Sequence, residues 1–410
     1  MNLAELVLGV MTALGGFVDV GELVFVAQAG AKYGYAAVWV LALGTIGIVV
    51  YCEMAGRIAA VRRQAVFDVV PLRLGRRLAF LTLFMATAVN LITCSAEIGG
   101  IAITLRLLFG LPLQSALVLG TLGILALVAI LPFKWIERTF GLLGLAMLVF
   151  AVATVRLGPD WGAVARGLIP QAPPVAGKES LVFAYFVVGI FSSVMMAYEV
   201  YFYASGGVED KWKPEDTKMN SIIAGLGSAL GSMLAIAILV LGNLVFRPRG
   251  IVPDSIDAIA LACAVPLGKV GLTVGLVGIL FAIGGAAAEV SLAGAYNYAQ
   301  YFALPWGRSK SLRAAPKFNL VWAAFLVAGM LIMMTGVDPV HLVEYSVIFS
   351  AAVLPLTYWP ILRHAGDPNV MGEHVNGRLV SALGWIYLVL ITIAAAAGVP
   401  LMFLTHAGQG

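Results

Sequence analysis

The fold of this chain is decided by the stretch Ala13-Leu14-Gly15-Gly16-Phe17-Val18-Asp19-Val20-Gly21-Glu22-Leu23-Val24-Phe25. It lies inside a long apolar segment, yet it carries two carboxylates three residues apart and three glycines. A charge at bilayer depth costs about 3 kcal/mol or more, so Asp19 and Glu22 should face a protein interior or a water-filled cavity. Each glycine weakens a helix by about 1 kcal/mol. The stretch predicts an interrupted membrane helix whose carbonyls and acids converge on a cation.

The composition is that of a polytopic membrane protein. Of 410 residues, 61% are hydrophobic and 11% are charged, whereas a soluble domain has about 25% charged residues. The net charge of +4 is spread among loops, so we expect no nucleic-acid partner. Three separated cysteines and four late histidines suggest neither a disulfide framework nor a zinc site. The sequence shows neither a nucleophile paired with a base nor a phosphate-binding loop, so we do not expect an enzyme. We also expect no resident cofactor.

Apolar segments predict eleven membrane spans in a single transporter domain, residues 1–410. They lie at 3–31, 35–61, 78–109, 112–133, 136–157, 180–205, 219–246, 269–302, 317–336, 340–362 and 378–404. The first lacks a basic n-region, so we expect it to be retained. Placing the N-terminus in the cytoplasm puts seventeen of the 25 Lys and Arg inside. We therefore expect an integral protein of a bacterial inner membrane, active as a monomer, with its C-terminus outside.

A Pro-rich loop at 158–179 divides the spans into five and six. The first span after this loop carries a third intramembrane carboxylate, Glu199, midway along its length. Polar-centred helices at corresponding places in two halves indicate inverted five-helix repeats with the binding site between them. We expect repeats at 1–157 and 180–362, with 378–404 as an additional helix and spans 1 and 6 interrupted. The other long connections are 62–77 and 247–268, the latter with a short amphipathic stretch from Ser255 to Ala264.

Each polar residue also has a structural interpretation. Asp19 and Glu22 could make a polar contact between helices or face the mouth of the cavity, although two acids without a basic neighbour favour a bound cation or proton. Glu199 could be held by Tyr198 and Tyr201. The methionines at 195 and 196 could be ordinary core residues, or one could supply a thioether ligand. Further intramembrane acids with either a structural or a relay role are Glu53, Glu97, Glu289 and Glu344.

These residues resemble the Nramp family, the natural resistance-associated macrophage proteins. The family motif Asp-Pro-Gly-Asn resembles Asp19-Val20-Gly21-Glu22. Similar runs extend from Gly34 to Leu41 and, in span 3, from Ala96-Glu97 to Ala102 and through Leu107 to Pro112. The resemblance implies the leucine-transporter-like fold of the APC superfamily, an all-α 5+5 inverted repeat. It also implies proton-linked import of divalent metals such as Mn²⁺ and Fe²⁺.

The chain departs from this family at three places. Met-Pro-His in span 6 is Met196-Ala197-Tyr198 here, Glu199 replaces a neutral residue, and Cys94 replaces an acid. The loss of the histidine and the acid predicts weak or absent proton coupling, with Glu97 as the remaining proton or vestibule acid. The run from Tyr198 to Tyr203 is similar to that of the Nramp-related magnesium transporters, and added carboxylates suit Mg²⁺ or Mn²⁺.

The sequence and the resemblance together predict a secondary transporter or facilitator for Mg²⁺ or Mn²⁺. The predicted ligands are Asp19, Glu22, Met196, Glu199 and, by family analogy, the backbone carbonyl of Ser193, with Gly21 and Tyr198 around them. The alternative is a cation-coupled transporter of amino acids or other organic solutes with the same fold. Three central acids disfavour that alternative, and a membrane sensor would need an output domain that the sequence lacks.

Overall fold

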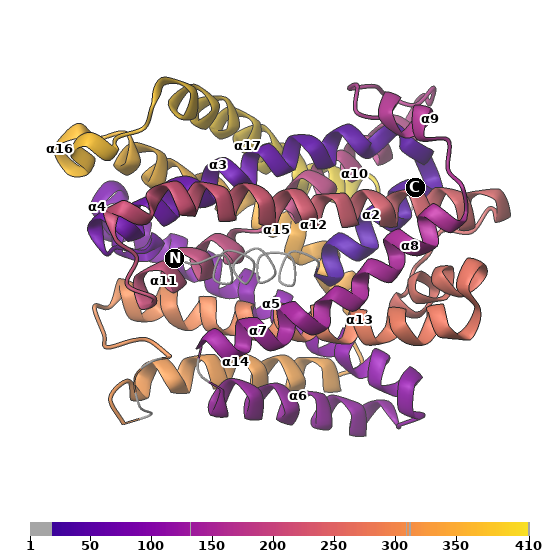
Figure 1. Cartoon of the computed structure of the whole chain (residues 1–410), viewed down its shortest axis with the longest axis horizontal. Coiled ribbons are helices and arrows are strands. Elements are labelled where there is room, and N and C mark those ends of the chain that lie inside the picture. Colours follow the sequence, from indigo (N-terminus) through magenta and orange to yellow (C-terminus); the bar gives the residue numbers. More distant parts are fainter. Residues whose placement is uncertain (1–18, 132, 309, 311–312, 409–410) are drawn as a thin grey trace.

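The computed structural model describes residues 19–131, 133–308, 310 and 313–408. In this part of the chain the regular elements are helices, without strands (Figure 1). The helices are α2 (Val20–Tyr33), α3 (Val38–Arg62), α4 (Val66–Leu74), α5 (Arg76–Phe109), α6 (Leu113–Ile130), α7 (Phe133–Gly144), α8 (Leu148–Arg156), α9 (Trp161–Arg166), α10 (Lys178–Val194), α11 (Ala197–Glu209), α12 (Thr217–Val245), α13 (Ile256–Tyr301), α14 (Pro316–Met334), α15 (Pro339–Ala365), α16 (Pro368–Met371) and α17 (Arg378–Leu404). Short 3-10 turns join several of them.

The described residues contain ten helical stretches long and apolar enough to cross a membrane. The first of these, Val20–Arg62, holds the two spans predicted at 3–31 and 35–61, because α2 and α3 are separated only by a 3-10 turn at Gly34–Ala37. Each of the other stretches matches one predicted span. The prediction of an all-α polytopic membrane protein with about eleven spans is therefore confirmed, although residues 3–18 of the first span lie outside the described residues.

Several connections are more structured than the sequence indicated. The 62–77 connection contains α4, and the Pro-rich 158–179 connection contains α9. The fifth span is divided into α7 and α8 by a 3-10 turn at Leu145–Met147. The amphipathic Ser255–Ala264 stretch forms the beginning of α13, and Gly268, with a φ of 63°, separates it from the span that follows. A positive φ of this kind favours glycine because a Cβ would be strained there.

The sixth span is interrupted as predicted. It consists of α10, which ends at Val194, and α11, which begins at Ala197. Between them, Met196 adopts φ −57° and ψ 122°, an extended conformation that cannot continue a helix. The first described span also starts abruptly, because Asp19 is extended and caps α2. Two helix ends are therefore available inside the molecule, each with unpaired backbone groups.

α2 lies in the interior and packs closely on α12 (Figure 1). An ideal Cβ at Gly30 would lie 2.0 Å from the carbonyl oxygen of Leu239, and one at Gly242 would lie 2.5 Å from that of Ala27. Small residues at both positions allow the two backbones to approach, as is common between membrane helices. This contact fixes α2, and hence its N-terminal end, against the rest of the bundle. By contrast, α17 lies at the edge of the molecule, against α15, α10 and α3.

Candidate ion-binding site

Asp19 links the start of α2 to the interruption of span 6. Its Oδ1 accepts the backbone N–H of Glu22 at 2.7 Å, which caps the first turn of α2. Its Oδ2 accepts the hydroxyl of Tyr198, in the first turn of α11, at 3.3 Å. Asp19 is only 1% exposed. The start of α2 and the start of α11 thus meet at this carboxylate, which brings the described part of span 1 next to the interruption of span 6.

Glu97 of α5 reaches the same helix end. Its Oε1 accepts the backbone N–H of Val20 at 3.2 Å, and its Oε2 is buried with no hydrogen-bond partner among the described residues. Asp19 and Glu97 also interact electrostatically. The N-terminal end of α2 therefore faces two carboxylates, which is favourable because free N–H groups and the helix dipole place partial positive charge there.

Glu22 is buried without a compensating partner among the described residues. It is 1% exposed, and both carboxylate oxygens lack a hydrogen-bond partner among the described residues. The charges with which it interacts are those of Asp19 and Glu199, which are of the same sign. A buried carboxylate in such surroundings is costly unless a cation or a proton accompanies it.

Glu199 lies on α11 beside Tyr198, within electrostatic reach of Asp19, Glu22 and Glu289. The structural alternative for this residue required hydrogen bonds from Tyr198 and Tyr201. In the structure Tyr198 donates to Asp19, and the Tyr201 hydroxyl donates to Thr357 at 3.4 Å. The neighbouring tyrosines therefore serve other acceptors, and Glu199 faces the acids of α2.

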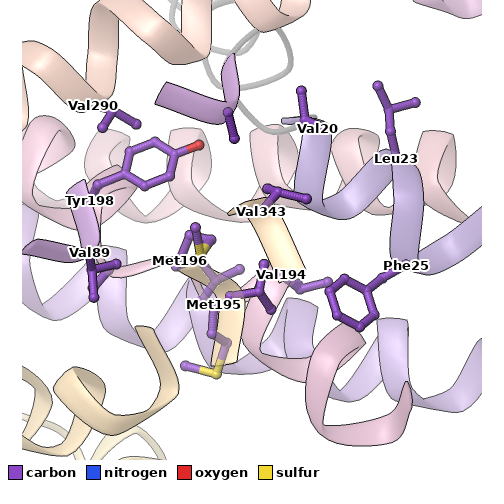
Figure 2. Packing of buried hydrophobic residues seen from close by; sticks show 14 of the residues in the cluster. Val20, Leu23, Phe25, Val89, Val194, Met195, Met196, Tyr198, Val290 and Val343 are labelled. Atoms are coloured by element: carbon purple, nitrogen blue, oxygen red, sulfur yellow. The ribbon is translucent and has the colours of Figure 1, made fainter. Parts of the chain in front are cut away.

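The two methionines of the break lie differently. The Sδ of Met195 is 2.6 Å from the position that a Cβ at Gly47 of α3 would take, so its thioether packs between helices. Figure 2 shows Met195 directed away from Tyr198 and Met196 closer to that ring. Both side chains are fully buried. Of the two, Met196 has the better position for contact with an ion.

Ser193 and Gly21 contribute backbone rather than side chains. The Ser193 hydroxyl donates to the carbonyl of Ile190 at 3.0 Å, and Ser193 lies in the last turn of α10, where main-chain carbonyls lack helical partners. At Gly21, an ideal Cβ would lie 2.9 Å from Val347 of α15 and 3.1 Å from Oδ1 of Asp19. Glycine therefore allows α15 to approach the break closely.

The other intramembrane acids occupy distinct places. Glu53 is paired with Arg57 at 2.9 Å, which supports its structural interpretation. Glu289 of α13 is half-buried and interacts with Glu199 and Tyr198. Glu344 lies on α15 near Gln28 and Lys32. Within the described ranges, no three His, Cys, Asp or Glu side chains are grouped tightly enough to form a ready-made metal site.

The hydrogen bonds that join these elements could not be read from the sequence. The bond between Tyr198 and Asp19 spans 179 positions, and that between Glu97 and Val20 spans 77. The signal that was available is the presence of single polar residues in otherwise apolar helices, which selected Asp19, Glu22, Glu97 and Glu199.

Comparisons with known proteins identify the family and the fold. Divalent metal cation transporters MntH of Ralstonia nicotianae and Agrobacterium fabrum are 26% and 25% identical to this chain, covering 92% of it in each case and 87% and 82% of the relatives. A crystal structure of the Eremococcus coleocola manganese transporter superposes with a TM-score of 0.81 at 19% identity, covering 96% of this chain and 86% of that one.

A more distant structural relative is Mhp1, a nucleobase-cation-symport-1 family transporter, with a TM-score of 0.61 at 16% identity and coverage of 98% and 92%. These similarities confirm the leucine-transporter-like fold. They belong to transporters rather than enzymes, as expected from the sequence. Residues 9–400 match the family described as natural resistance-associated macrophage protein-like, and the chain is therefore a member of the Nramp family.

Proposed function

We propose that this protein transports divalent metal cations across a membrane by alternating access, with the ion held by Asp19, Glu22, Met196, Glu199 and the backbone carbonyl of Ser193. The observation that carries the proposal is Glu22, whose two buried oxygens have no partner among the described residues while like charges surround it. A divalent cation would compensate several of these acids at once.

Mn²⁺ is the first cargo to test, because the curated relatives are named as divalent metal cation transporters and one structural relative is a manganese transporter. Mg²⁺ is the second, since carboxylates at positions 22 and 199 make the ligand set rich in hard oxygens. A thioether from Met196 would favour the softer Mn²⁺ and Cd²⁺ over Mg²⁺.

The test is uptake into proteoliposomes, with Mg²⁺, Ca²⁺, Zn²⁺ and Cd²⁺ as competitors of Mn²⁺. We expect saturable uptake that is lost in Asp19→Ala. Uptake that continues unchanged in this variant would refute the assignment of the site.

Proton coupling is proposed to be weak or absent. Cys94, fully buried on α5, stands one helical turn from Glu97 where the family has an acid, and span 6 has Tyr198 in place of a histidine. A pH-sensitive dye trapped in the vesicles should report metal flux without acidification. Metal-dependent acidification that disappears in Glu97→Gln would contradict this part of the proposal.

The alternative cargo is an amino acid or another organic solute, which the fold also allows, since Mhp1 carries a different substrate class. The acids around the α2 break argue against a carboxylate substrate because charges of the same sign repel. A thermal-shift screen separates the two: stabilisation by divalent ions supports a metal site, whereas stabilisation by amino acids alone supports the alternative.

The remaining proposals concern placement. The bacterial relatives and the distribution of Lys and Arg support an inner-membrane protein with a cytoplasmic N-terminus. We propose that one chain is the transporting unit, because the described ion-site residues all come from helices of the same chain. Cysteine accessibility at loop positions tests the orientation.

A further inference from the structure

A second polar cluster lies along α2, beyond the helix break. Gly21, Gln28 and Lys32 share one face of this helix because they are seven and four residues apart. Gly21 abuts Val343 of α15, and Gln28 hydrogen-bonds Glu344 of the same helix. This face therefore follows α15 from the ion site toward the end of the molecule at which the C-terminus lies (Figure 1).

Glu344 is buried in this cluster without full compensation. It is 5% exposed, and its Oε2 has no hydrogen-bond partner among the described residues. Tyr185 of α10 interacts electrostatically with it, and the Tyr185 hydroxyl is likewise buried and unpartnered in the described chain. Buried polar atoms are nearly always hydrogen-bonded, so two unpartnered oxygens in one cluster indicate a missing ligand.

Lys32 supplies the positive charge of the cluster. Its Nζ donates to the carbonyl of Gly408 at 2.5 Å and lies 5.4 Å from the ring centre of Phe186. Its electrostatic partners are Glu344 and Glu179, and Glu179 also accepts the Tyr33 hydroxyl at 2.9 Å. The Lys32 ammonium is thus hydrogen-bonded to the C-terminal segment, and its charge partly compensates those of Glu344 and Glu179.

We propose that Glu344, Gln28 and Tyr185 form an outer docking site for the transported divalent cation, and that Lys32 is a counter-charge which opposes its occupation. This inference rests on the proposed function and on the orientation that places this end outside. A carboxylate, an amide oxygen and a phenol oxygen are hard ligands that suit Mn²⁺ or Mg²⁺. Val343, the residue before Glu344, packs on Gly21 of α2.

The experiment measures Mn²⁺ uptake into proteoliposomes over a range of concentrations. For Glu344→Gln we expect KM to rise about fivefold with Vmax retained, because a capturing charge is lost while the central ligands remain. For Lys32→Gln we expect KM to fall, because the opposing charge is removed. In the double variant the effect of Lys32→Gln should shrink, since its target acid is gone.

A matched control is Asp254→Asn, an exposed carboxylate in the connection before α13, on the same predicted side. Its KM should equal that of the wild type. If Glu344→Gln lowers thermal stability and leaves KM unchanged, Glu344 is a structural acid and the outer site is refuted. An unchanged KM in Lys32→Gln would refute the counter-charge.

The two proposals fail in different ways. Loss of the proposed function would appear as no Mn²⁺ uptake by the wild-type protein. Failure of the outer site alone would leave wild-type uptake intact and sensitive to Asp19→Asn, but with Glu344→Gln kinetically silent. Equilibrium binding adds a direct readout: Asp19→Asn should retain weak Mn²⁺ binding, and Asp19→Asn combined with Glu344→Gln should lose it. Equal binding in both would also overturn the outer site.

Discussion

Replacing Glu22 by Gln should leave the metal-free protein at least as stable as the wild type and weaken its response to metal. Both oxygens of Glu22 are buried, unpartnered among the described residues and surrounded by charges of the same sign. Glutamine keeps the volume of the side chain but removes a charge that is costly to bury, so the metal-free melting temperature should stay equal or rise. Two unit charges 4 Å apart interact by about 4 kcal/mol at an effective dielectric constant of 20.

A divalent ion doubles this attraction, but Glu22→Gln also removes the cost of burying the carboxylate and keeps an amide oxygen as a ligand. We therefore expect a net affinity decrease of about a hundredfold, or about 3 kcal/mol. The assay is thermal unfolding in detergent with and without Mn²⁺. The control is Glu373→Gln, whose side chain is 89% exposed and which should behave as wild type. A metal-free melting temperature that falls, with an undiminished shift on adding Mn²⁺, would show that Glu22 is a structural acid.

Three further predictions concern other parts of the molecule. Gly30→Ala should destabilise the protein by about 3 kcal/mol, because its Cβ would lie 2.0 Å from the backbone of Leu239. The control Gly225→Ala has open space around it and should not change stability. Equal melting temperatures of the two variants would refute the close contact of α2 and α12. Met196→Leu should reduce uptake of Cd²⁺ more than that of Mg²⁺. Met195→Leu is the control and should leave this selectivity unchanged, because the sulfur of Met195 packs by Gly47. Equal selectivity in the two variants would exclude Met196 as a thioether ligand. The hydrogen bond from Arg73 at 2.8 Å holds the pKa of Asp367 below its usual range. The pair therefore contributes stability above the ordinary value of about 3.9 and loses it as the pH falls through the lowered value. Arg73→Gln should lower the melting temperature at pH 6, and this difference from the wild type should shrink as the pH is lowered further below the ordinary value; a pH-independent difference would contradict this.

The sequence was sufficient for the helices and for the interruption of span 6; the predicted first half of span 1 lies outside the described residues. Long apolar runs specify membrane helices almost by themselves, because every backbone group must be paired in lipid. Asp19, Glu22 and Glu199 were found because a charge in such a run is expensive. The sequence could not tell which methionine faces the ion, since that depends on the extended conformation of Met196 and on the space at Gly47 of α3.

Contacts between distant elements were beyond sequence reasoning for the same reason. Nothing in the span around Tyr198 indicates that its hydroxyl donates to Asp19 rather than to the adjacent Glu199. The docking of Glu97 on the N–H of Val20 likewise depends on how α5 crosses the end of α2. Such bonds depend on how the helices pack. The pattern of apolar residues predicts which face of a helix is buried, but not which atoms meet there.

The acids around the start of α2 differ in how far the protein itself compensates their charge. Asp19 and Glu97 each accept a backbone N–H from the first turn of α2, so part of their charge is already compensated by the helix end. Glu22 has no such donor in the described chain, so a bound cation would have to compensate its whole charge. A site in which every acid were uncompensated would bind an ion too tightly to release it, whereas one in which every acid were capped would not attract it. We therefore expect Glu22 to be the residue whose surroundings change most between the loaded and the empty transporter, with Asp19 and Glu97 holding the end of α2 in both.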